Sequence, residues 1–98
     1  MINQYYDPVP GSVQCLKKQG ITPAKQKSLQ ADLAALNTIL AEGAKAADFA
    51  IAKPDFTGHG VCTPFPYVQG VTDAAPFHPT PSGALAIALA DEHALRLR

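Results

Sequence analysis

The chain has 98 residues, of which 47% are apolar, and its eight basic and eight acidic side chains give a formal net charge of zero. This length and composition are typical of one small globular domain and argue against a disordered chain. The balanced charge offers no general attraction to nucleic acid or to an anionic membrane, and the pair Lys17-Lys18 is too short to form a basic patch.

Membrane and targeting segments are not expected from this sequence. No stretch reaches the roughly 18 consecutive apolar residues of a membrane span. The opening Met-Ile-Asn-Gln has neither the basic nor the apolar region of a signal peptide.

A short run of strand-forming residues opens the chain at residues 2–6, and proline-containing turns end it. The loop that follows, as far as Ile21, carries Cys15 and is expected to be tethered by it. Cys15 and Cys62 are either two reduced thiols or one disulfide, because spacing along the sequence does not decide between them. A bridge would indicate an oxidising compartment.

The clearest element is a long amphipathic helix over residues 24–47, with Thr22 as its N-cap and Pro23 in its first turn. Apolar side chains recur at the spacing of one helical face. They are Leu29, Leu33, Leu36, Leu40, Ala44 and Ala47. We expect this face to pack on the chain's own core, with a dimer seam as the alternative.

A second strand is predicted at residues 48–52, where Lys53-Pro54 ends it. A loop without periodicity follows over residues 55–80, and loops of such length are commonly functional. The last element is an alanine- and leucine-rich helix over residues 81–97. Its first half is apolar nearly all round, so we expect it to be well buried.

The order strand, helix, strand, helix predicts an α/β fold in which a right-handed crossover joins two parallel strands. Two strands cover little of the apolar surface of two helices, because a parallel sheet is normally covered on both faces. We therefore expect the chain to be one end of a larger sheet structure.

His78 lies in the stretch D-A-A-P-F-H-P-T-P-S-G, residues 73–83, between Phe77 and Pro79. Proline fixes its own φ and restricts the residue before it, so the imidazole is expected to be held rigidly on a short loop. Thr80 supplies the N-cap of the helix that follows. A fixed histidine on a loop is a candidate general base.

Several blocks follow one another along the chain: Y-Y-D-P-V-P-G-S-V-Q-C, an amphipathic helix, D-F-A-I-A, F-T-G-H-G-V-C, and F-H-P-T-P-S-G before an apolar helix. In this order they resemble the C-terminal half of secreted actinobacterial SGNH hydrolases, the GDSL-type lipases and esterases. The resemblance covers nearly the whole chain. It implies that residues 1–98 are the C-terminal part of a three-layer αβα, flavodoxin-like fold with a short parallel sheet.

In this family the F-H-P-x-x-x-G block carries the catalytic histidine, which corresponds to His78. The resemblance implies a carboxylic ester hydrolase in which His78 is the general base for a serine and then the acid for the leaving alcohol. The substrate would be a lipid, short-chain or carbohydrate ester, and no cofactor is implied. The P-G-S and H-G-x-C loops of the family each carry a cysteine, which implies a Cys15–Cys62 disulfide and a secreted or cell-envelope location.

The nucleophile of the family is missing from this sequence. Its serine stands in a G-D-S block, and its oxyanion-hole glycine and asparagine stand in two further blocks, none of which occurs here. The chain's own serines, Ser12, Ser28 and Ser82, stand in neither G-D-S nor G-x-S-x-G. The 98-residue chain alone is therefore predicted to be inactive and to need the N-terminal half of the domain as its partner.

The group that orients the imidazole also departs from the family pattern. Many members have an aspartate three residues before the histidine, where this chain has Ala75, whereas Asp73 stands five residues before it. Asp73 and the carbonyl of Ala75 are the two candidates for this role.

Two other functions remain open. In one, the chain is a truncated, non-catalytic product that self-associates or binds a partner through exposed apolar faces. In the other, it is a small metal-binding module. Its zinc ligands would be Cys15, His59, Cys62 and His78.

A further set of aromatic side chains either lines an acyl pocket or covers loops and sheet edges. These are Tyr5, Tyr6, Phe65 and Tyr67.

Overall fold

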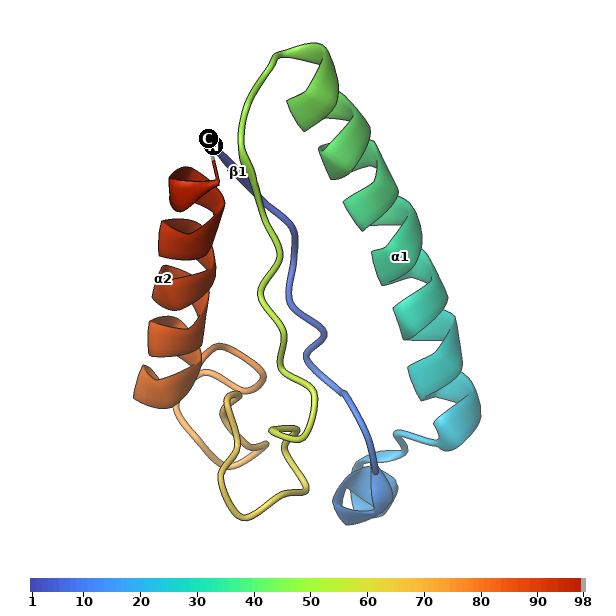
Figure 1. The fold of residues 1–98 in the computed structure, drawn as a ribbon. Helices are drawn as coiled ribbons and strands as arrows, with labels where there is room; N and C mark the ends of the chain where they lie inside the picture. Colours follow the sequence, from blue (N-terminus) through green and yellow to red (C-terminus); the bar gives the residue numbers. More distant parts are fainter. Residues whose placement is uncertain (98) are drawn as a thin grey trace.

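Two parallel strand segments run between two long helices in the computed structural model, which describes residues 1–97 (Figure 1). The elements in chain order are β1 (Ile2–Asn3), the 3₁₀ helix η1 (Gln14–Gln19), α1 (Pro23–Ala46), β2 (Ile51–Ala52) and α2 (Pro81–Arg96). Ile2 pairs with Ile51 and Asn3 with Ala52 in a parallel register. The predicted α/β class and the parallel pairing of the two strands are confirmed.

β1 is shorter than the predicted residues 2–6. The Gln4 N–H still donates to the Ala52 carbonyl (2.8 Å), but Tyr5 turns to α1 for its partners. Its N–H donates to Asn37 Oδ1 (2.7 Å), and its carbonyl accepts from Asn37 Nδ2 (3.0 Å). An amide side chain thus satisfies backbone groups that a strand would otherwise pair, and the ladder ends there.

β2 is also shorter than predicted, because the first residues of the predicted strand at 48–52 complete the end of α1. Asp48 has a left-handed φ of 55°, and the Phe49 N–H donates to the Ala44 carbonyl (2.8 Å). A left-handed residue followed by such a return bond is a common way to terminate a helix. The pattern of alternating side chains did not distinguish this cap from a strand.

α1 begins as predicted, since Thr22 Oγ1 accepts a hydrogen bond from the Lys25 N–H (3.2 Å) and Pro23 lies in the first turn. Its apolar face is only partly covered. Ala44 is buried, but Leu29, Leu36 and Ile39 are 45%, 43% and 65% exposed. A sheet of two short strands is too narrow to cover a helix of 24 residues. The prediction that the whole face packs on the chain's own core is therefore wrong for Leu29 and Leu36, whereas Ile39 lies outside the predicted face.

α2 is much less buried than its composition predicted. Only Gly83 and Ala94 are buried, while Leu85 and Leu89 in its first half are 60% and 55% exposed. β2 is the strand that α2 mainly contacts, and Ala86 and Ile87 pack against the cluster of Tyr6, Phe56 and Val68. One short strand and one loop cluster leave much of the helix surface uncovered. Within residues 1–97 no helix is both long and apolar enough to cross a membrane.

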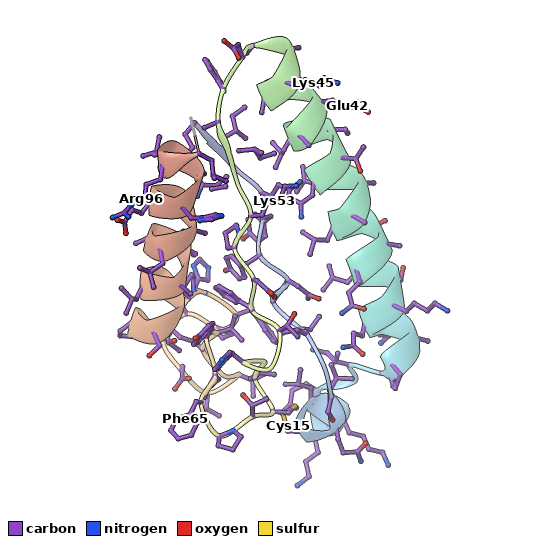
Figure 2. The ribbon with its side chains drawn as sticks, viewed as in Figure 1. Cys15, Glu42, Lys45, Lys53, Phe65 and Arg96 are labelled. Carbon is purple, nitrogen blue, oxygen red and sulfur yellow. A yellow bond between two sulfur atoms is a disulfide. The ribbon has the colours of Figure 1, made fainter. Side chains whose placement is uncertain are left out.

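Most of the buried core lies between loops and not under the sheet. One cluster contains Tyr6, Phe56 and Val68, and a second contains Val9, Val13 and Leu16. These residues come from the segments that follow β1 and β2, which gather at one end of the molecule with Cys15 and Phe65 (Figure 2). The long loop before α2 is therefore a packed part of the core, and it is this part that positions His78.

Candidate catalytic histidine and its loop

His78 lies on a turn that is hydrogen-bonded on both sides. The Phe77 N–H donates to the Gln69 carbonyl (2.9 Å), and the Gln69 N–H donates to the His78 carbonyl (2.8 Å). Val68 and Pro79 form an antiparallel bridge beside them. The backbone around the histidine is thus paired with a neighbouring loop segment, while the imidazole itself is exposed.

Phe77, directly before the histidine, has a left-handed backbone with a φ of 64°. This conformation is unfavourable for a residue with a bulky side chain and persists only where the surroundings enforce it. The Phe77 carbonyl accepts a hydrogen bond from the Tyr6 hydroxyl (2.9 Å). Its side chain helps to line an apolar cavity of about 250 Å³ together with Pro8, Val9 and Leu29.

The two groups considered for orienting the imidazole both have backbone partners. The Asp73 carboxylate accepts from the Gly70 N–H (2.7 Å), and the Asp73 N–H donates to the Gly70 carbonyl (3.1 Å). Asp73 therefore closes its own turn. The Ala75 carbonyl accepts from the backbone N–H of His78 (3.1 Å), which fixes the backbone of the histidine.

The glycine of the F-H-P-x-x-x-G block, Gly83, lies where α2 meets the loop. A Cβ atom added at Gly83 would collide with the carbonyl oxygen of Tyr67. The same carbonyl accepts the Thr80 N–H (2.9 Å), and Thr80 Oγ1 accepts the Gly83 N–H (3.1 Å). The predicted cap is confirmed, and the glycine allows the first turn of α2 to touch the backbone of the loop.

The predicted Cys15–Cys62 disulfide is confirmed, with the two Cα atoms 5.5 Å apart. It links η1 to the loop that follows β2. Next to it, a Cβ atom at Gly60 would collide with the Pro10 carbonyl oxygen, so the two loops also touch through their backbones.

The zinc hypothesis is wrong for the site considered, because a disulfide leaves neither Cys15 nor Cys62 as a thiolate ligand. Among residues 1–97, no three side chains of histidine, cysteine, aspartate or glutamate are grouped so as to hold a metal ion.

His59, the other histidine of the loop, is fixed by its own neighbours. Its Nδ1 lies 2.9 Å from the Phe65 carbonyl oxygen, and since a carbonyl only accepts, Nδ1 carries the proton. The ring stacks on Tyr67 with centroids 3.8 Å apart and planes 1° apart. These contacts close the loop on itself and give His59 a structural role.

The aromatic residues proposed for an acyl pocket are spread over different surroundings. Tyr6 belongs to the core cluster, and Tyr67 packs against it. Phe65 is 78% exposed, and Tyr5 lines a groove with Leu33 and Leu36 of α1. They do not form one pocket in this chain.

The serines lie on separate elements. Ser12 Oγ accepts the Gln14 N–H (3.2 Å) at the start of η1, Ser28 lies in α1, and Ser82 lies in the first turn of α2. Within the part of the chain that the structure describes, no hydrogen bond joins a serine hydroxyl to a histidine ring. No serine is arranged with His78 in the manner of a nucleophile and its base.

Comparison with known proteins gives no match: no family model, no curated protein and no solved structure is similar to the chain. Its functional assignment therefore depends on its own residues.

Proposed function

We propose that this chain supplies the general base, His78, of a serine ester hydrolase with the three-layer αβα fold of the SGNH family. The observation that carries the proposal is the F-H-P-T-P-S-G block, in which an exposed imidazole stands on a turn tied to Gln69, and Gly83 packs on the loop backbone. An imidazole presented in this way can accept the proton of a serine hydroxyl and return it to the leaving alcohol.

The nucleophilic serine and the oxyanion hole would come from a segment that carries the family's G-D-S, glycine and asparagine blocks. Two features support a docking place for such a segment. In β1 the N–H groups of Ile2 and Gln4 point to β2, so the backbone of Asn3 faces the open edge on which another parallel strand can pair. On α1, Leu29 and Leu36 are exposed apolar side chains without a covering layer.

The substrate would be a carboxylic ester of a lipid, a short-chain acid or a carbohydrate, and the enzyme would act outside the cell or in the cell envelope. The Cys15–Cys62 disulfide supports this location, because structural disulfides persist in oxidising compartments.

The first test uses the 98-residue chain by itself. We expect no turnover of p-nitrophenyl butyrate above that of its His78→Ala variant, and no labelling by a serine-directed fluorophosphonate, because no serine is hydrogen-bonded to a histidine among residues 1–97. Labelling of Ser12, Ser28 or Ser82 together with turnover that depends on His78 would contradict this account.

A second candidate function is self-association without catalysis, and the exposed apolar side chains of α1 favour it. In this case the chain forms dimers at micromolar concentration in analytical ultracentrifugation. Leu36→Glu shifts the population toward monomer, because it places a charge in the apolar contact. Ala31→Glu, on the opposite side of α1, is the matched control and leaves the population unchanged. A monomeric wild-type chain would exclude this candidate.

A further inference from the structure

The residue before His78 is held in an unfavourable backbone conformation by a contact from far along the sequence. Phe77 has a φ of 64°, and its carbonyl accepts a hydrogen bond from Tyr6, in the segment that follows β1. Left-handed aromatic residues do not persist without compensating interactions. Phe77 packs against the cluster of Val9, Val13 and Leu16, and its N–H donates to the Gln69 carbonyl. Its carbonyl accepts the hydrogen bond of the Tyr6 hydroxyl, 71 residues away in sequence.

We propose that Tyr6 is a positioning residue for His78: by donating to the Phe77 carbonyl, its hydroxyl holds Phe77 in the left-handed conformation and so fixes the direction in which the imidazole is presented. The role of His78 as a base rests on the proposed function. The control of its loop by Tyr6 does not.

Tyr6 is well suited to hold the loop, because its own ring is immobilised. The side chain is 9% exposed and stacks on Phe56 with centroids 4.6 Å apart. Tyr5 also stacks on it, with centroids 4.8 Å apart. The backbone hydrogen bonds of Phe77 and His78 to Gln69 join the turn to another loop, whereas Tyr6 lies three residues after β1. Tyr6 thus connects the histidine loop to the sheet.

The hydroxyl of Tyr6 keeps its proton over the range in which a histidine titrates. Burial and a hydrogen bond with Tyr5 raise the pKa of Tyr6 to about 12. Because this folded-state pKa is above the usual value of 10.0, the neutral form stabilises the fold fully below pH 10. That contribution is lost only as the pH rises toward 12. The donor is therefore present at neutral pH.

The test is Tyr6→Phe, which removes the hydroxyl and keeps the stacked ring. Hydrogen exchange of individual amides, measured by NMR on the whole 98-residue chain, is the readout. We expect the Phe77 and His78 amides to exchange about five times faster or more, the factor that corresponds to one lost hydrogen bond. Amides in α1 are expected to change much less. Tyr67→Phe is the matched control, since it removes a hydroxyl from the same aromatic cluster, and it leaves the two amides unchanged.

Two results would overturn the inference. One is unchanged exchange at Phe77 and His78 in Tyr6→Phe, and the other is the same acceleration in α1, which indicates only a loss of global stability. The unmodified chain gives a second measurement that does not depend on the variant: the hydroxyl proton of Tyr6 is expected to be protected from exchange, and a rapidly exchanging proton would contradict the contact.

Failure of this inference can be distinguished from failure of the proposed function. Faster amide exchange at Phe77 and His78 in Tyr6→Phe, in a protein without esterase activity, supports the positioning role of Tyr6 and contradicts the proposed esterase function. Esterase activity that depends on His78, with unchanged exchange of these amides in Tyr6→Phe, supports the proposed esterase function and contradicts the positioning role of Tyr6.

Discussion

Removing the Cys15–Cys62 disulfide is expected to lower the free energy of unfolding by about 4 kcal/mol, the chain-entropy value for cross-linked residues at this separation. Small domains have total stabilities of roughly 5–15 kcal/mol, so the loss takes a large share. The effect is concentrated on the loops, because the two clusters of buried side chains come from the segments that the bridge connects. The measurement is urea unfolding of the Cys15→Ser/Cys62→Ser double variant.

The control for the disulfide is reduction with dithiothreitol. It should lower the unfolding midpoint of the wild-type chain to that of the double variant, and it should leave the double variant itself unchanged. A reduced wild-type chain that retains its midpoint would show that the loops are held by their packing alone.

Gly83→Ala is expected to destabilise the chain by about 2 kcal/mol or more, as for other substitutions that overfill a packed contact. The added methyl group collides with the Tyr67 carbonyl, which also accepts the Thr80 N–H. A backbone oxygen cannot rotate away as a flexible side chain can, so the first turn of α2 must shift from the loop. His78, two residues before Thr80, shifts with it.

Gly43→Ala provides the matched control for Gly83→Ala. Gly43 lies inside α1, and a Cβ atom there meets no atom within 4 Å. Alanine is the better helix former, so this substitution should stabilise the chain by about 1 kcal/mol. A lower unfolding temperature for Gly83→Ala and a higher one for Gly43→Ala support the close contact at Gly83. An unchanged or higher unfolding temperature for Gly83→Ala would disprove it.

The features of the fold that depend on local sequence could be predicted. Thr22-Pro23 and Thr80-Pro81 begin the two helices as expected, because a threonine cap followed by proline encodes a helix start within a few residues. The parallel arrangement of the strands follows from the long helix between them. The resemblance to a known family implied the pairing of Cys15 with Cys62, which spacing along the sequence left open.

The features that depend on distant contacts could not be predicted. The end of β1 is set by Asn37, which satisfies Tyr5 from 32 residues away. The start of β2 is instead set by the local helix cap at Asp48, which was missed because no glycine marks its left-handed position. The exposure of α2 depends on how little sheet the chain forms, which the composition of the helix does not reveal.

In the candidate site, too, the contacts between residues far apart in sequence could not be predicted. His78 and its rigid loop were visible in the F-H-P block, but the contact of Tyr6 with the Phe77 carbonyl joins residues 71 positions apart. The left-handed Phe77 carries no sequence signal either, since such a conformation is usually marked by glycine or asparagine. The close packing of Gly83 against the loop was indicated only by its place in the F-H-P-x-x-x-G block of the family.

The role of His78 as a base can be tested by joining this chain to the N-terminal half of an actinobacterial SGNH esterase that carries the G-D-S, glycine and asparagine blocks. We expect a folded hybrid that hydrolyses p-nitrophenyl butyrate, with turnover about a thousandfold lower in His78→Ala, within the range for loss of a general base. His59→Ala and His93→Ala, which replace the chain's other two histidines, should retain most of the turnover. A hybrid that unfolds cooperatively but has no turnover, or one whose turnover survives His78→Ala, would contradict the assignment of His78 as the base.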